Sequence, residues 1–469
     1  MSRRLSKDEF NELVQEIINE LHESPEEAVE DAVKQLQARG VPMSSILRYV
    51  GEDFVPSADI QHIEVSLRHL DNMLRENGTV ENIIGQITDL CEECQKSVSH
   101  KVFVGKSEFV KLALDVLNKL RGSKEIVGTV LQGLLTITSD QPDILKNTNA
   151  PQTMALLLEE ETDVDNLNLL LSWMKVSCTV SERNRQQIVE TECIPRLKNV
   201  LENFGTVPSI VKGVCSVFRA LLSDDETRVE KGHHQEHARQ IGNCALITLA
   251  NLLKQYNSNE EVVGDILLAL AAVVTRNEFC ERILQIRDGQ SIVHILEVFS
   301  NFSEYERISR QGLKLLKALA GNDKARVEIV KAGAAPLVVS SMFRHQDSPQ
   351  LTACGNACIA ALTLRSAANS KAFCEVDAPL AILDGMRKHI QIVNVQKQGC
   401  RAIRNMVSRC RDICPVFLDL GAEDLINVIL RNFYAQCEYD AKSALRDLGC
   451  HVEYLDDWFG GRGESCVKN

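Results

Sequence analysis

The chain has 469 residues, of which 44% are hydrophobic, 25% are charged and 5% are aromatic, and its net charge is −13. Nucleic-acid-binding proteins usually carry a basic excess, so this balance disfavours a nucleic-acid partner. The longest apolar run, residues 266–274, is too short to span a bilayer, and we expect no contact with membranes. The start of the sequence has no apolar signal core. Sixteen cysteines without such a signal indicate reduced thiols and a cytoplasmic protein, with the nucleus as the alternative.

Residues 1–97 predict an N-terminal helical region. Apolar residues recur at helical spacing over residues 7–22. A second helix is expected after Ser24, because Pro25 suits its first position, Glu27 completes a capping box and Gly40 is placed to end it. Two further helices are expected over roughly residues 58–76 and 80–96. We expect these helices to cap the rest of the chain.

The next region is marked by a repeated spacing. Gly289, Gly333, Asp377 and Gly421 lie 44 residues apart, and each stands between a short amphipathic stretch and an apolar one. Self-similarity at this period predicts an all-α solenoid, in which each repeat buries its apolar face against its neighbours. At Gly333 the pattern predicts a left-handed turn, which glycine adopts at low cost.

The period extends towards the N-terminus. Anchors near residues 106, 150, 193 and 242 give about eight repeats over residues 98–455, followed by a tail over residues 456–469. Within a repeat the pattern predicts a short first helix, a tight turn, a second helix, a loop and a long third helix. The last tryptophan, Trp458, is expected to seal the terminal apolar face, since the final repeat has no neighbour.

This three-helix unit resembles the armadillo repeat. The stretches "TRNEFCE" (residues 275–281), "VQKQGCRAIRNMV" (395–407) and "CEYDAKSALRDLGCHVEYLDDWFGGRG" (437–463) are similar, in the same order, to one branch of the armadillo-repeat family. The resemblance implies an armadillo-repeat superhelical solenoid. It also implies a non-enzymatic scaffold or adaptor that binds proteins along a concave groove lined by the third helices, without a cofactor.

Within the armadillo family, importin-α holds peptides with an Asn on successive third helices, each with a Trp four residues earlier. We call the corresponding third-helix positions of this chain the Asn row, and only one of them, Asn405, is an asparagine. The corresponding residues of the other repeats are Ala220, Ala272, Ala318, Ala361 and Asp447. A function as a nuclear transport-type receptor that binds peptide signals is therefore the alternative hypothesis rather than the leading one.

A neighbouring row is richer in basic residues. Four residues after the Asn row, the chain has Asp224 in the first of these repeats. The later repeats have Arg276, Asn322, Arg365 and Arg409 there, and four residues before the row lie Lys314 and Arg401. On a third helix these positions share one face. Together with Asn405 they form the candidate groove, which favours an acidic or phosphorylated segment of a protein partner. The competing interpretation is that these residues only cap helix ends or are solvated.

The segment "VEKGHHQEHARQ" (residues 229–240) is rich in histidine. His233, His234 and His237 suit a partner-contact loop. Their spacing matches no standard metal motif, so we predict no metal, and a solvated loop is the remaining interpretation. Trp173 lies on a third helix, where a core position is favoured over a groove position. No catalytic motif occurs in the sequence, and we expect a monomer.

Overall fold

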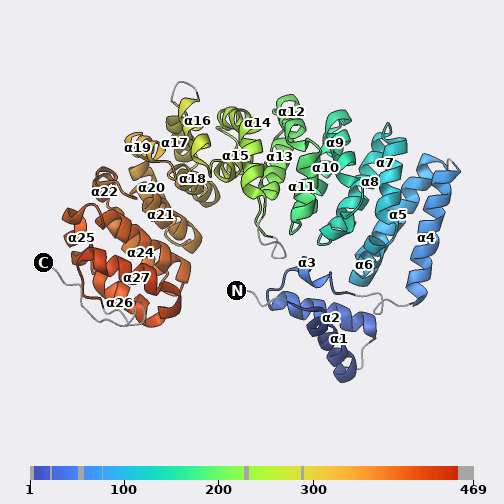
Figure 1. Ribbon diagram of the computed structural model, residues 1–469, viewed down its shortest axis with the longest axis horizontal. Helices are drawn as coiled ribbons and strands as arrows, with labels where there is room; N and C mark the ends of the chain where they lie inside the picture. The colour runs from blue at the N-terminus through green and yellow to red at the C-terminus, as the bar shows by residue number, and fades with distance from the viewer. Residues whose placement is uncertain are drawn as a thin grey trace. The chain divides into compact units, whose positions relative to one another are not determined.

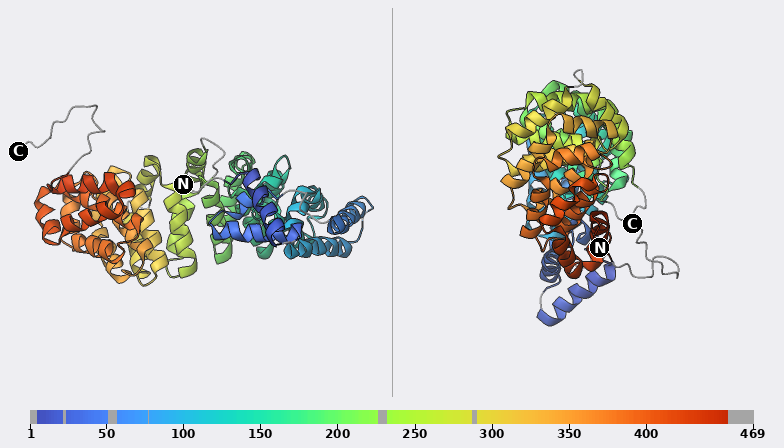
Figure 2. Two further views of the ribbon diagram at one scale, coloured as in Figure 1. Left: turned by 90° about the horizontal axis from the view of Figure 1, so that it is seen from below. Right: turned by 90° about the vertical axis from the view of Figure 1, so that its left-hand side faces the viewer.

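The computed structural model describes residues 5–21, 24–50, 57–76, 78–225, 232–286 and 290–452. Helices make up all the regular structure of these residues, and no strand occurs among them (Figures 1 and 2). The chain divides into two compact units, unit 1 (Met1–Thr248) and unit 2 (Leu249–Asn469). Within the described residues, no helix combines the length and the apolar character that a membrane span requires.

The helices of unit 1 are α1 (Lys7–Leu21), α2 (Pro25–Ala38), α3 (Met43–Ile46), α4 (Ser57–Arg75), α5 (Val80–Lys96), α6 (Val98–Lys106), α7 (Phe109–Leu120), α8 (Lys124–Thr138), η2 (Pro142–Leu145), α9 (Ala150–Glu160), α10 (Val164–Cys178), α11 (Glu182–Glu190), α12 (Cys193–Phe204) and α13 (Pro208–Leu221). The unit boundary falls within α14 (His234–Gln255).

The helices of unit 2 are α15 (Glu260–Val273), α16 (Asn277–Gln285), α17 (Ser291–Asn301), α18 (Glu306–Leu319), α19 (Asp323–Lys331), α20 (Ala334–Arg344), α21 (Pro349–Leu362), α22 (Ala367–Cys374), α23 (Ala378–Lys388), α24 (Val393–Val407), η3 (Arg411–Ile413), α25 (Cys414–Asp419), α26 (Ala422–Asn432) and α27 (Tyr434–Leu448).

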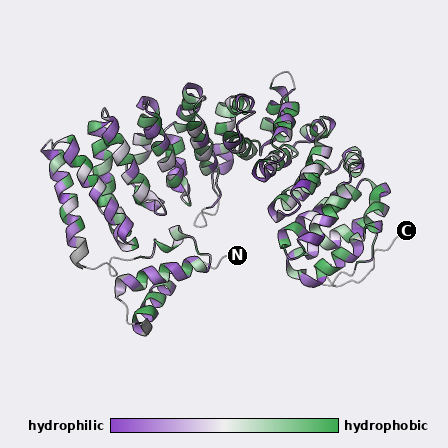
Figure 3. Ribbon diagram, turned by 180° about the vertical axis from the view of Figure 1, so that it is seen from behind, coloured by the Kyte–Doolittle hydropathy of each residue, from purple (hydrophilic) through white to green (hydrophobic). Residues whose placement is uncertain are grey.

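The third helices of successive repeats stack side by side within each unit. In unit 1 these are α5, α8, α10 and α13, and in unit 2 they are α15, α18, α21, α24 and α27, each in contact with the next. Hydrophobic and hydrophilic residues alternate around the helices, as amphipathic packing requires (Figure 3). The predicted all-α repeat architecture is confirmed. Trp173 is fully buried in α10, so its predicted core position is also confirmed.

The turn between the first and second helices fixes the register of the repeat. Gly333, Asp377 and Gly421 are the N-cap residues of α20, α23 and α26, and all three have left-handed backbone angles, with φ of 96°, 62° and 77°. The left-handed turn predicted at Gly333 is therefore present. In unit 1, Glu192 takes the same conformation before α12, one residue before the predicted anchor. Gly289 lies outside the described residues.

The repeat boundary predicted near Gly242 is wrong. Gly242 lies inside α14, a continuous helix of 22 residues. One long helix here takes the place of a first helix, a turn and a second helix. The 96 residues between the neighbouring anchors suggested two longer repeats, but a glycine can sit within a helix at a modest cost and need not mark a turn.

The N-terminal helices α1–α3 form a hydrophobic cluster of their own, which includes Phe10 and extends to Val102 of α6. Arg48 docks this cluster onto the repeats, because its Nε atom pairs with Asp143 at 3.0 Å and its Nη2 atom donates to the Val180 carbonyl at 3.2 Å. The division into residues 1–97 and 98–455 stays a prediction. The tail over residues 456–469, with Trp458, lies outside the described residues.

Second and third helices approach closely where glycine faces methionine. A Cβ atom added at Gly355 of α21 would lie 2.6 Å from the sulfur of Met342 on α20. The same pair recurs 44 residues later, where Gly399 of α24 faces Met386 of α23. Because a buried core has no spare volume, these glycines are required by packing rather than by backbone conformation.

We expect Gly355→Ala to destabilise the protein by about 1–3 kcal/mol, since the new methyl group must displace Met342 from a packed core. Thermal unfolding followed by circular dichroism measures the loss. Adding Met342→Ala should remove much of the clash, which a double-mutant cycle would show. Gly85→Ala on α5 is the matched control: a Cβ there meets nothing within 4 Å, so equal destabilisation of both variants would contradict the close-packing argument.

Candidate functional site

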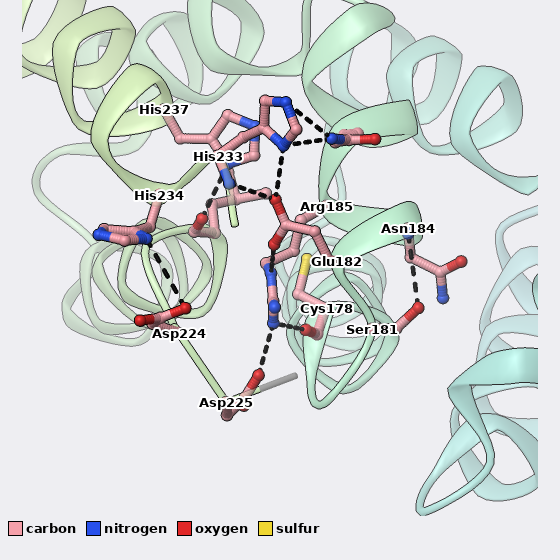
Figure 4. Close-up of polar contacts among 12 residues, drawn as sticks. Cys178, Ser181, Glu182, Asn184, Arg185, Asp224, Asp225, His233, His234 and His237 are labelled. Atoms are coloured by element: carbon pink, nitrogen blue, oxygen red, sulfur yellow. Dashed lines mark hydrogen bonds and ion pairs between the residues drawn. The ribbon is translucent and has the colours of Figure 1, made fainter. Parts of the chain in front are cut away.

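Within the histidine-rich segment, His233 is held by the carboxylate of Glu182. The backbone N–H of His233 donates to Oε1 of Glu182 at 2.6 Å, and the His233 ring nitrogen Nδ1 lies 3.2 Å from the same oxygen (Figure 4). The side chain of Gln186 also contacts the His233 ring. Glu182 is buried at the start of α11, so this contact fixes the position of His233.

Glu182 belongs to a buried ion network that is centred on Arg185. The Arg185 side chain is only 1% exposed, and it pairs with Glu182 at 2.8 Å and with Asp225 at 2.7 Å. It also donates to the Cys178 carbonyl at 2.8 Å. Burial opposes ionisation of both carboxyls, but their hydrogen bonds and the nearby guanidinium outweigh it, so the pKa values of Glu182 and Asp225 are lowered. The network therefore ties the end of α10, α11 and the segment after α13 together.

The three candidate histidines do not converge. His237 is buried in α14, where its Nδ1 atom lies 3.0 Å from the Leu221 carbonyl, and burial lowers its pKa. Its predicted place on a partner-contact surface is therefore wrong, because the ring faces the core. His233 remains exposed, and His234 lies 3.8 Å from Asp224. Among the described residues, no cluster of three metal-ligating side chains has the geometry for a metal ion.

Four residues of the candidate groove lie in turns rather than on third helices. The third helices α15, α18, α21 and α24 end before these positions. Arg276 is the N-cap residue of α16 and pairs with Glu278 at 3.2 Å. Asn322 is buried and caps α19 by accepting the Ala325 N–H. Arg365 and Arg409 lie in the turns that follow α21 and α24. Their predicted position on one helix face is wrong, because the helices are about one turn shorter than periodicity suggested.

The other three candidates do lie on third helices. Lys314 is exposed on α18, and it has no hydrogen-bond or ion-pair partner among the described residues. Arg401 on α24 pairs with the buried Asp440 of α27 at 2.9 Å. Asn405 donates to the Ala360 carbonyl of α21 at 2.7 Å, so its amide joins two neighbouring repeats. That bond gives Asn405 a structural role.

Further cations accompany Lys314 and Arg401. Arg307, Arg310 and Lys317 of α18, with Lys397 and Arg404 of α24, complete what we call the basic face: Arg307, Arg310, Lys314, Lys317, Lys397, Arg401 and Arg404. These residues recur at spacings of three and four along each helix and so share its exposed side. The four-residue step used on the sequence reached Lys314 and Arg401. A further step of four would have reached Arg310 and Lys397, and steps of three would have reached Arg307, Lys317 and Arg404.

Helix α21 lies between the two basic helices and contacts both of them. Its side towards solvent is built from small residues, with Cys354 and Ala361 partly exposed and Ala357 just covered. Burial raises the pKa of Cys354, while Lys314, Arg310 and Lys317 oppose that rise, which places the α18 cations beside α21. The helix α21 holds no charged residue, whereas α18 and α24 together hold seven basic residues and one acidic residue, Glu306.

Buried thiols have packing roles. Burial raises the pKa of Cys178 to about 12 and of Cys94 to about 12, and it also raises the pKa of Cys400. A thiol in such a setting stays protonated at neutral pH and is a poor nucleophile. The cysteines on these third helices therefore act as small hydrophobic residues.

Comparison with known proteins identifies the family. The family model "Armadillo repeat-containing protein 6 N-terminal domain" matches residues 2–66, and the model "ARMC6" matches residues 66–467. The chain belongs to the armadillo repeat-containing protein 6 family. It is 33% identical to the Armadillo repeat-containing protein 6 homolog of Drosophila melanogaster over 467 residues, with 98% of each chain covered. It is 29% identical to Armadillo repeat-containing protein 6 of Homo sapiens, over 99% of this chain and 94% of the human protein.

A solved structure shares the fold of this family member. It comes from the work "A conserved phosphorylation switch controls the interaction between cadherin and beta-catenin in vitro and in vivo" and matches with a TM-score of 0.59 and 14% sequence identity. The match covers 85% of this chain and 80% of that chain. At this identity the likeness supports the armadillo-repeat fold and nothing finer.

We expect Arg185→Met to destabilise unit 1 by about 3 kcal/mol or more, because it leaves Glu182 and Asp225 without their shared cation. Urea unfolding monitored by the fluorescence of the buried Trp173, in a Trp458→Phe background, measures the effect. Arg183→Met is the control on the same helix, since Arg183 is exposed and bonds only Asn147 among the described residues. Similar losses for the two variants would contradict a central role for Arg185.

His237 should make the stability of unit 1 depend on pH. Its folded-state pKa lies below the unfolded value of about 6.5. The stability that its neutral form contributes is therefore present above about pH 6.5 and is lost as the pH falls through the folded pKa, by at most ~1.4 kcal/mol per pH unit. Trp173-monitored unfolding at pH 7.5 and 5.5 should show a smaller loss in His237→Gln than in the parent chain, and an unchanged loss would contradict this assignment. His234→Gln is the control, because His234 is partly exposed.

Proposed function

We propose that this protein is a non-enzymatic scaffold or adaptor that binds an acidic or phosphorylated segment of a partner protein on the basic face of unit 2. The armadillo-repeat fold supports a binding role, since its stacked third helices offer an extended surface. The finer proposal concerns where the partner lies and which charge it carries.

The observation that carries the proposal is a set of lysines without partners. Lys314, Lys317 and Lys397 of the basic face have no hydrogen-bond or ion-pair partner among the described residues. Other cations nearby are already neutralised, because Arg401 pairs with Asp440 and Arg404 lies 3.7 Å from Asp447. On a chain with a net charge of −13, this local positive charge suits an acidic ligand.

The transport-receptor alternative gains no support from Asn405. Its amide is bonded to the Ala360 carbonyl, and four alanines and Asp447 occupy the equivalent row in the other repeats. A peptide backbone would have to displace that bond to be held in the importin manner. An acidic segment needs no such rearrangement, because Lys314 and Lys397 are exposed or partly exposed.

We expect charge reversal at Lys314 and Lys317 (K314E, K317E) to weaken binding of a glutamate-rich labelled peptide about tenfold or more at 0.1 M salt, since each new carboxylate repels the ligand. Fluorescence anisotropy measures the affinity, and affinity capture from cells with the same variants would identify the partner. The matched control is the pair Lys324→Glu and Lys331→Glu on α19, where both lysines are exposed. Equal affinities of the two double variants for the glutamate-rich peptide would contradict the proposal.

The lysines are better test positions than Arg401. Its partner Asp440 is only 6% exposed, so reversal of Arg401 would place a like charge beside a buried carboxylate and disturb the stack of α24 on α27. Reversal of Arg409 is free of this problem and serves as a further test of the turn after α24. It has no partner among the described residues.

A further inference from the structure

The basic face is divided into two rows by a neutral helix. Lys314 and Lys317 mark the row on α18, and Lys397 with Arg401 and Arg404 marks the row on α24. Helix α21 separates them and contributes no charge. A ligand that engages both rows must therefore cross α21, and its acidic groups must be spaced to match.

The spacing follows from helix packing. Packed helices lie about 8–10 Å apart, so the two rows, two helix steps apart, are separated by roughly 16–20 Å. An extended chain advances about 3.3 Å per residue, so it covers that distance in about five or six residues. Side chains alternate along an extended chain, so only an even separation points both acidic groups to the same side. Six residues is the separation that meets both conditions.

The residues between the acidic groups face α21. Positions 3 and 5 of a seven-residue segment point to the same side as positions 1 and 7. Opposite them stand Cys354, Ala357 and Ala361, whose short side chains leave room between the longer lysines and arginines of the two rows. Apolar side chains at positions 3 and 5 suit that surface, because Ala and Cys offer no hydrogen-bond partner other than a weak thiol.

The free cations also indicate which acidic group is bound. The cations of the two rows that have no partner are lysines, which act as point charges. The planar guanidinium of arginine, which can donate two parallel hydrogen bonds, is the group better suited to phosphate. Arg401 and Arg404 already face Asp440 and Asp447. Carboxylates therefore fit this surface better than phosphate groups.

We propose that the basic face binds an extended segment with the pattern acid–x–apolar–x–apolar–x–acid, in which the two acidic residues are Asp or Glu six positions apart. This inference rests on the proposed function and adds to it the register and the chemical class of the ligand. The first acid lies at one row, the last acid at the other, and the apolar pair lies over α21.

The affinities of labelled peptides for the full chain, measured by fluorescence anisotropy, test this proposal. Peptides of one composition carry glutamates at positions 1 and 7, or at 1 and 4, with leucine at 3 and 5. We expect the 1–7 peptide to bind about fivefold or more tightly than the 1–4 peptide, since only it reaches both rows. Replacing both leucines by alanine should weaken the 1–7 peptide, and Ala357→Leu on α21, which fills the space beneath the leucines, should do the same.

The outcomes separate the register from the proposed function. If all acidic spacings bind equally and K314E/K317E weakens them all, the register is overturned and the proposed function stands. If no acidic peptide binds in a lysine-dependent way, the proposed function fails. If phosphoserine peptides bind far more tightly than glutamate peptides, the assignment to carboxylates is overturned. The peptide series on the unaltered chain keeps the test valid even if Ala357→Leu disturbs folding, which circular dichroism would report.

Discussion

Contact between consecutive third helices is the interaction on which each unit depends. A solenoid repeat has no core of its own and buries its apolar face only against the repeats on either side. The approach must be close, and glycine makes it so: a Cβ at Gly213 of α13 would meet Leu171 of α10, and one at Gly133 of α8 would meet Cys91 of α5. Within a repeat of unit 2, Phe299, Met342 and Met386 on second helices fill the space that a missing Cβ leaves on the third helix.

Stacking leaves polar groups at the helix ends, and these are bonded from one repeat to the next. His345 and His389, 44 residues apart, each bond a carbonyl in the preceding repeat, at 2.8 and 2.9 Å. Beside them Arg344 pairs with Glu304 at 2.8 Å, and Lys388 pairs with Asp347 at 2.6 Å. In unit 1, the buried ion pairs of Arg185 also connect neighbouring repeats. In these two repeats of unit 2, register is therefore fixed both by apolar volume and by bonds between loops.

The sequence was sufficient to predict the repeat and the left-handed turn at Gly333, because the 44-residue step is visible in the residues themselves and glycine adopts φ > 0 at low cost. The boundary predicted at Gly242 was wrong, because one continuous helix stands where two helices and a turn were expected. A glycine in the sequence does not itself show whether it lies in a turn or inside a helix. The predicted positions of Arg276, Asn322, Arg365 and Arg409 were also wrong, because periodicity does not show where a helix ends. His237 was read as a surface residue for a similar reason: only tertiary packing decides which of several neighbouring histidines is buried.

The pairing of charges separates structural cations from those available for binding. Removing an ion from water is costly, so a buried cation such as Arg185 needs its carboxylates in place, and its contacts serve stability. Lys314 and Lys397 carry no such partners, and an unpaired lysine on a helix contributes little to folding. Stability alone gives no reason to gather such lysines on α18 and α24, on either side of the uncharged helix α21. Binding of a ligand with negative charges would give such a reason, and the width of α21 then determines how far apart its acidic groups must be.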